Sequence, residues 1–167
     1  MSDERPYENG DWIVHLHHGV GQVKGIESKL IGGNKSKYVK VDTSSSTMWV
    51  PLEQLSDEET FRPVATPVEC EEMFSIMQEP AEVMHDNYKV RRNRIRRVGK
   101  DNSLPDIARL VRDLWARNQD KRLNQAEQTA LKRYRERMLR EWVIALGLTE
   151  SEAEAKLLSI LSETQPV

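Results

Sequence analysis

The spacing of hydrophobic residues along the chain changes once, near residue 65. Before that point, short segments rich in β-branched and aromatic residues are separated by turn signals such as Asn9-Gly10 and Gly32-Gly33. These segments cover residues 12–16, 20–27, 37–42 and 47–51. The pattern predicts four or five short strands that form a small, strongly bent sheet or barrel of the SH3 or Tudor type.

After Pro67 the hydrophobic residues follow a helical period. A face with i, i+3, i+4, i+7 spacing is formed by Cys70, Met73, Phe74 and Met77. Capping residues and helix-ending glycines then predict further helices over residues 81–98, from Ser103 through Trp115, over 124–146 and over 149–162. This half of the chain is therefore expected to be a compact all-α bundle of about five helices.

The predicted fold class is α+β, with the two kinds of element separated by domain. We expect a Tudor-like β domain over residues 1–65 and a helical domain over residues 66–167. The chain has no internal repeat and no long low-complexity linker, so the two domains are expected either to pack against each other or to hinge within residues 56–66.

The net charge of −2 conceals a strong segregation of charge along the chain. Residues 66–87 contain six acidic residues and no Lys or Arg, whereas residues 88–140 contain seventeen basic residues and six acidic ones. Local potential steers binding even where the whole-chain total is close to zero. The basic block therefore predicts a polyanionic partner.

The overall composition points to a cytoplasmic protein. Hydrophobic residues make up 38% of the chain and charged residues 31%, and no apolar run approaches the roughly 18 residues that span a bilayer. The first residues, Met1 to Glu4, lack the pattern of a secretion signal, and Cys70 has no second cysteine with which to form an internal disulfide. We expect no membrane association and a monomer.

Signatures of catalysis are missing from the sequence. It contains no Gly-rich phosphate loop, no GxSxG and no HExxH motif. His15, His17 and His18 are close enough in sequence to suggest a metal site, but a turn leading into the glycines that follow is the simpler interpretation. We therefore predict no catalytic residues, no metal and no cofactor.

The most informative segment is the basic run from residue 88 to 100. Seven of the twelve residues from Lys89 to Lys100 are basic and none is acidic, although like charges four residues apart destabilise a helix. DNA phosphates would offset that cost through contacts that are largely independent of base sequence. The residues expected to contact DNA are Lys89, Arg91, Arg92 and Arg94, together with Arg133 and Arg135 from a second basic run. Tyr88 can act as a packing group or as a wedge against a base step.

An ordered set of motifs resembles one known family. The opening Tyr7-Glu8-Asn9-Gly10-Asp11-Trp12-Ile13-Val14, followed by His17-His18-Gly19-Val20-Gly21, is similar to the start of CarD and CdnL proteins and to the polymerase-interacting domain of transcription-repair coupling factor. Trp49-Val50-Pro51 continues the match, and the segment from Ile107 to Trp115 resembles the helical domain of CarD proteins.

This resemblance implies a regulator that binds the β subunit of bacterial RNA polymerase and contacts promoter DNA at the upstream edge of the melted bubble. The polymerase contact would involve Lys29, Ile31, Met48, Trp49 and Pro51. Trp49 stands where the family often has arginine, and Tyr88 where it has a tryptophan wedge. The expected function is stabilisation of the open promoter complex; the alternative is an adaptor that binds polymerase and an acidic protein without touching DNA.

Overall fold

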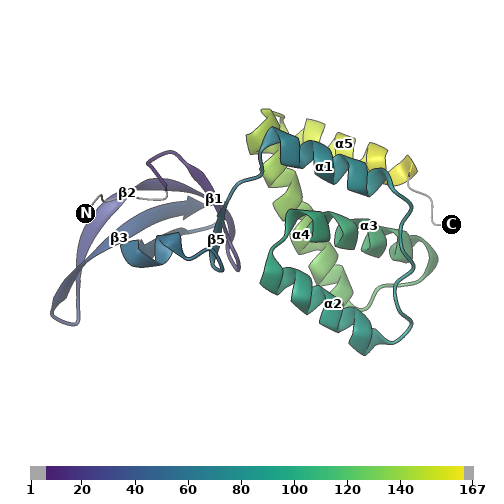
Figure 1. Cartoon of the computed structure of the whole chain (residues 1–167), viewed down its shortest axis with the longest axis horizontal. Coiled ribbons are helices and arrows are strands. Elements are labelled where there is room, and N and C mark those ends of the chain that lie inside the picture. The colour runs from purple at the N-terminus through teal and green to yellow at the C-terminus, as the bar shows by residue number, and fades with distance from the viewer. Residues whose placement is uncertain (1–6, 164–167) are drawn as a thin grey trace. The chain divides into compact units, whose positions relative to one another are not determined.

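A computed structural model describes residues 7–163, and for Ile31 it describes the backbone alone. The chain forms two compact units, residues 1–64 and 65–167 (Figure 1). At the boundary, the Val64 amide donates to the Trp12 carbonyl in the first unit. The amide of the next residue, Ala65, donates to the buried Glu141 carboxylate in the second unit. Adjacent residues are thus each anchored to their own unit.

The N-terminal unit is a five-stranded antiparallel sheet with strand order β4-β3-β2-β1-β5. The strands are β1 (Trp12–His15), β2 (Gly19–Ile31), β3 (Asn34–Thr43), β4 (Thr47–Pro51) and β5 (Phe61–Pro63), with a short 3-10 helix η1 (Leu52–Ser56) before β5. All four strand segments predicted from the sequence are present, and the short β5 was not among them. The predicted Tudor-like bent sheet is confirmed.

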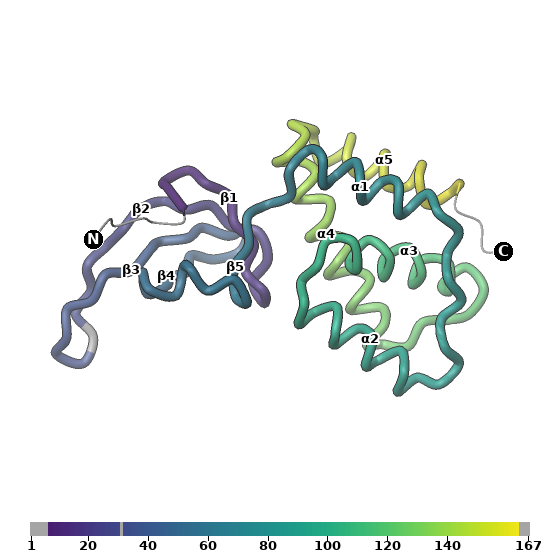
Figure 2. The backbone as a smooth tube through the Cα atoms, viewed as in Figure 1, coloured from purple at the N-terminus to yellow at the C-terminus, as the bar shows by residue number. Residues whose placement is uncertain are grey.

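The β2–β3 hairpin is much longer than its neighbours, as the tube trace shows (Figure 2). Its turn consists of Gly32 and Gly33, whose φ angles are +59° and +81°. Positive φ at both central residues is the requirement of a type I′ turn, which glycine meets without steric cost. The register shifts between Val23 and Gly25, where a β-bulge bends the long strand.

Alternation along β3 and β4 separates a core face from an outer face. Val39 lies opposite Val50, and both are buried. Trp49, between Met48 and Val50, faces the other side and is 41% exposed. Because successive side chains of a strand point to opposite faces, the sheet buries the valines and leaves the tryptophan accessible.

The C-terminal unit is a bundle of five helices within the described residues, which confirms the second half of the predicted fold class. They are α1 (Pro67–Gln78), α2 (Tyr88–Asp101), α3 (Leu104–Asp120), α4 (Gln125–Leu146) and α5 (Glu150–Glu163). Capping boxes begin α1 at Thr66 and α4 at Asn124, of which the one at Asn124 was predicted. The helices share one core that includes Trp142. The rings of Trp142 and Phe74 pack edge to face, with their centroids 4.8 Å apart.

The boundaries of the second helix differ from the prediction. Residues 81–87 are not helical, and α2 begins at Tyr88, capped by the Asn87 side chain. The polar backbone groups before the helix find partners elsewhere: the Glu82 amide donates to Asp113, and the carbonyls of His85 and Asp86 accept from Arg91. Hydrogen bonds to side chains stand here in place of helical backbone bonds. Ser103 also differs from expectation, since its side chain makes no capping bond to α3.

No helix within residues 7–163 is both long and apolar enough to cross a membrane.

Candidate functional site

The outer face of the β unit carries an ordered aromatic group. The indole Nε1 of Trp49 donates to Glu27 Oε2 at 3.0 Å, and the Lys29 ammonium lies 3.4 Å from the centroid of the Trp49 ring. A cation over the face of tryptophan is favourable by about 0.5–1 kcal/mol at exposed sites. The tryptophan is thus both accessible and held in one orientation.

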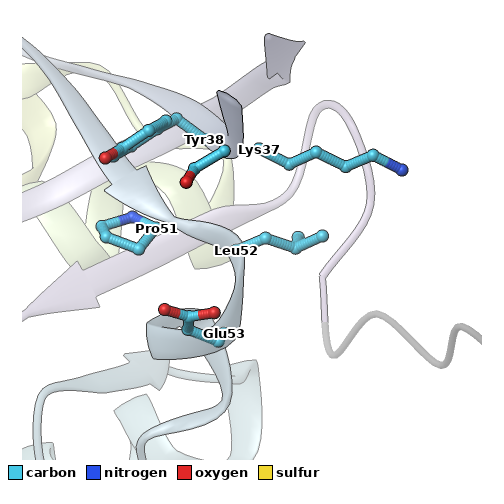
Figure 3. A pocket seen from close by; sticks show the side chains of 6 residues that line it. Lys37, Tyr38, Pro51, Leu52 and Glu53 are labelled. Carbon is cyan, nitrogen blue, oxygen red and sulfur yellow. The ribbon is translucent and has the colours of Figure 1, made fainter. Parts of the chain in front are cut away.

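The strand that carries Trp49 is also an edge of the sheet. β4 pairs with β3 on one side, and among the described residues no strand covers its other side. Beyond its end lies a hollow lined by Ser36, Lys37, Tyr38, Pro51, Leu52 and Glu53. Figure 3 shows the Tyr38 ring beside Pro51, while Lys37 points away from both. An edge strand, an aromatic anchor and a neighbouring hollow together make a surface suited to a protein partner.

The structure brings together only part of the residues predicted for polymerase binding. Lys29, Trp49 and Pro51 lie on the outer face, by the alternation of the paired strands. Met48 lies on the opposite face, where it packs against the core of the sheet. The side chain of Ile31 lies outside the described part of the molecule.

Helix α2 presents one exposed face of positive charge. Lys89, Arg92, Arg96 and Lys100 are all exposed and recur at three- and four-residue intervals, so they line one face of the helix. Ile95 and Val98 pack on the opposite face. These four residues are called the basic stripe below.

Tyr88 is the first residue of α2 and stands beside the basic stripe. Its ring is 53% exposed, and the Arg92 guanidinium carbon lies 5.9 Å from the ring centroid. Burial in the helical core therefore does not account for this aromatic group. The ring is therefore accessible to a binding partner.

Two arginines of the same run have structural roles instead. Arg91 is 7% exposed and forms an ion pair with the buried Glu127 of α4. Arg94 Nη2 lies 2.8 Å from the buried carboxylate of Asp113 in α3. Both were predicted to contact DNA, but these guanidinium groups are turned toward the protein, so their placement does not support that role.

The second basic run, in α4, is divided in the same way. Lys132 and Arg133 are exposed, whereas Arg135 Nη2 lies 2.8 Å from Glu154 of α5. Tyr134, which lies between Arg133 and Arg135 in the sequence, packs tightly against α2. A Cβ atom added at Gly99 would lie 2.7 Å from the tyrosine hydroxyl. Helices α2 and α4 are therefore closely packed at Gly99.

Arg96 and Lys100 belong to the exposed surface but were not among the predicted contacts. The signal for them was available in the sequence. The aliphatic residues of the run are Val90, Ile95 and Val98, and the helical period places residues 89, 92, 96 and 100 on the face opposite Ile95 and Val98.

The histidine cluster and the cysteine have structural environments. His15 Nδ1 accepts the backbone N–H groups of His17 at 3.0 Å and His18 at 3.1 Å, which closes the turn between β1 and β2. Among residues 7–163, no group of three His, Cys, Asp or Glu side chains is placed to hold a metal ion. Cys70 is buried in the helical core, and burial raises the pKa of its thiol to about 11.

Comparison with known proteins finds similarity over both units. A family model described as "CarD, C-terminal domain" matches residues 72–158, and one described as "CarD-like/TRCF RID domain" matches residues 7–64. The Bacillus subtilis (strain 168) protein "Putative transcription factor YdeB" is 26% identical over 155 residues, which cover 89% of this chain and 98% of that protein. The transcription-repair-coupling factor of Staphylococcus epidermidis (strain ATCC 12228 / FDA PCI 1200) is 34% identical over 53 residues, or 31% of this chain and 4% of that protein.

Proposed function

The chain belongs to the CarD family of non-enzymatic transcription factors, and from that membership we propose that it stabilises the open promoter complex of a bacterial RNA polymerase. The N-terminal unit binds the polymerase β subunit, and the helical unit binds promoter DNA through its phosphate backbone. The protein acts in the cytoplasm as a monomer.

The match of residues 7–64 to the polymerase-interacting domain of transcription-repair coupling factors supports the first contact. The exposed Trp49 on strand β4 supplies an aromatic anchor for such a contact, since the binding energy of an interface is concentrated in a few aromatic and arginine residues. Lys29 and Glu27 place charges of opposite sign beside the anchor, so the complementary surface on the β subunit is expected to offer a partner for each.

The basic stripe is the observation that carries the DNA contact. Four exposed like charges on one helical face repel one another, and no acidic residue of α2 precedes Asp101 to offset them. Each contacted phosphate releases counterions and relieves this repulsion. Contacts of lysine and arginine with phosphates carry no sequence information, which suits a regulator recruited by polymerase and not by a DNA sequence.

Selective binding to one state explains how such contacts would regulate initiation. A protein that binds the open complex more tightly than the closed complex shifts the equilibrium between them by its differential affinity. A difference of about 1.4 kcal/mol changes that equilibrium tenfold. If the Tyr88 ring enters the distorted base step at the edge of the bubble, it contributes to binding affinity only when the DNA has opened.

The test is the lifetime of competitor-challenged open complexes on a bacterial ribosomal promoter, measured with cognate polymerase in the presence and absence of the protein. A longer lifetime is expected, and the Arg92→Gln/Arg96→Gln variant should abolish most of the gain while still binding polymerase. An unchanged lifetime despite confirmed polymerase binding would refute the proposal and favour the adaptor with an acidic protein partner.

A further inference from the structure

One arginine joins three parts of the helical unit at the start of α2. Arg91 pairs through Nε with Glu127 of α4, and its Nη1 donates to the carbonyls of His85 at 2.9 Å and Asp86 at 2.7 Å. These two carbonyls lie immediately before the Asn87 cap and Tyr88. The segment that precedes α2 is therefore hydrogen-bonded to Arg91, a side chain of α2 itself.

Glu127 is bound both to Arg91 and to the N-cap residue of its own helix. Its Oε2 accepts the Asn124 amide at 3.0 Å, while its own amide donates to Asn124 Oδ1 at 2.8 Å, so the same residue completes the capping box of α4. The carboxylate is buried, with 2% of the residue exposed. One oxygen holds α4 and the other holds Arg91, which leaves neither group freedom to move independently.

From this geometry we propose that Glu127 is a positioning residue for Tyr88: through Arg91 it fixes the backbone of residues 85–88 and so sets where the tyrosine ring meets DNA. The inference rests on the proposed function for its DNA readout, but its structural part stands on the contacts alone. Glu127 itself lies too deep to touch DNA.

A second buried acid holds the same segment farther back and serves as a comparison. Asp113 accepts the Glu82 amide at 3.0 Å and Arg94 Nη2 at 2.8 Å. This contact lies six residues before Tyr88, whereas the carbonyls held by Arg91 lie two and three residues before it. Loss of the Glu127 contact should therefore disturb Tyr88 specifically.

Glu127→Gln is the informative variant, because glutamine at the same position also completes a capping box but cannot neutralise Arg91. Glu136→Gln is its matched control, since Glu136 is an exposed acid of the same helix. Both variants remove one negative charge from the unit. A purely electrostatic effect would strengthen DNA binding in both, whereas positioning predicts that Glu127→Gln alone shortens the open-complex lifetime.

Arg91→Lys provides a second route in case Glu127→Gln fails to fold. Lysine retains the charge, but a single ammonium cannot reproduce the planar fork that reaches a carboxylate and two carbonyls. Circular dichroism identifies which variants retain helical content, and a folded Arg91→Lys is expected to reproduce the effect of Glu127→Gln.

The decisive experiment is a double-mutant cycle with Tyr88→Ala, read as open-complex lifetime. Glu127→Gln is expected to shorten the lifetime roughly three- to tenfold when Tyr88 is present, as for residues coupled in one network, and to have no further effect in the Tyr88→Ala background. Equal shortening in both backgrounds would overturn the inference.

A DNA-free measurement separates this inference from the proposed function. In protein labelled with 3-fluorotyrosine, the 19F resonance of Tyr88 should shift or broaden in Glu127→Gln and not in Glu136→Gln, while that of Tyr38 in the β unit stays unchanged. An unchanged Tyr88 resonance would overturn the inference. If the wild-type protein fails to lengthen the open complex, the proposed function fails, and the fluorine spectrum still decides whether Glu127 positions Tyr88.

Discussion

Arg94 Nη2 lies 2.8 Å from Asp113 Oδ2, and the Asp113 side chain has no exposed surface. The same carboxylate accepts the Arg112 guanidinium at 2.9 Å and the Glu82 amide at 3.0 Å. A buried charge is tolerated only when it is paired and hydrogen-bonded. Asp113 thus joins α2, α3 and the segment between α1 and α2, and part of the positive charge of α2 stabilises the fold.

The first prediction concerns the loss of stability when the Asp113 carboxylate is removed. Asp113→Ala leaves two guanidinium groups and an amide without their buried partner, so we expect it to lower the free energy of unfolding by about 3–5 kcal/mol. The matched control is Asp106→Ala, because Asp106 and Arg109 form an exposed pair with side chains 46% and 43% accessible. Such pairs contribute about 0–1 kcal/mol. Urea unfolding of both variants checks the difference, and similar losses would contradict the assigned role of Asp113.

The second prediction separates phosphate-binding from structural arginines on the same helix. Arg92→Gln should reduce the slope of log affinity for duplex DNA against log salt concentration by about 0.9, the value for one phosphate contact. Arg94→Gln should leave that slope unchanged and lower thermal stability instead, because Arg94 is bound to Asp113. Titrations at several salt concentrations measure both slopes. A reduced slope in Arg94→Gln would mean that this pair opens when DNA binds.

The local elements of this fold were predictable because their signals are local. The Gly32-Gly33 turn, the apolar face of α1 and the capping box at Asn124 all depend on residues a few positions apart. The start of α2 was not predictable in this way. The Glu82 amide binds Asp113, and the carbonyls of His85 and Asp86 bind Arg91. The first of these contacts joins residues 31 positions apart, and such a contact is not visible in the periodicity of one sequence.

The candidate surfaces show the same limit. The sequence located the basic block, since charge is visible in it. Strand alternation separates Trp49 from its neighbours Met48 and Val50 but does not decide which of them is exposed. Helical period places Arg91 and Arg94 on the face of Ile95 and Val98, away from Arg92. Their pairing there with the buried acids Glu127 and Asp113 is what the sequence alone does not show. Helical period alone would have assigned Arg96 and Lys100 to the exposed face.

The third prediction tests the anchor on the β unit. Trp49→Ala should weaken binding to an isolated polymerase β fragment by about 2 kcal/mol or more, as expected of an aromatic hot spot. Leu30→Ala is the control, since Leu30 is a 73% exposed apolar residue whose position in β2 faces the side opposite Lys29. Isothermal titration calorimetry measures both affinities. A large loss for Leu30→Ala with none for Trp49→Ala would move the contact to the other face of the hairpin.

The fourth prediction follows from Cys70, whose thiol is buried in the helical core. Burial, with a smaller contribution from the Glu141 charge, raises the thiol pKa from 9.0 to about 11. The folded protein therefore holds the thiol proton over a range of pH in which the unfolded chain releases it. Stability rises with pH only where the unfolded state binds more protons, so here it must fall.

The stabilising contribution of the protonated thiol is fully present below pH 9 and decreases as the pH rises through 9 toward about 11. A shift of this size corresponds to about 2–3 kcal/mol. Lysines and tyrosines titrate in the same range, so the measurement is the difference between wild type and Cys70→Ala in urea unfolding at pH 8, 9, 10 and 11. We expect the wild type to lose more stability than the variant over this range. Parallel curves would show that the thiolate forms inside the folded protein without cost, which a cysteine buried among Met73, Phe74 and Met77 does not allow.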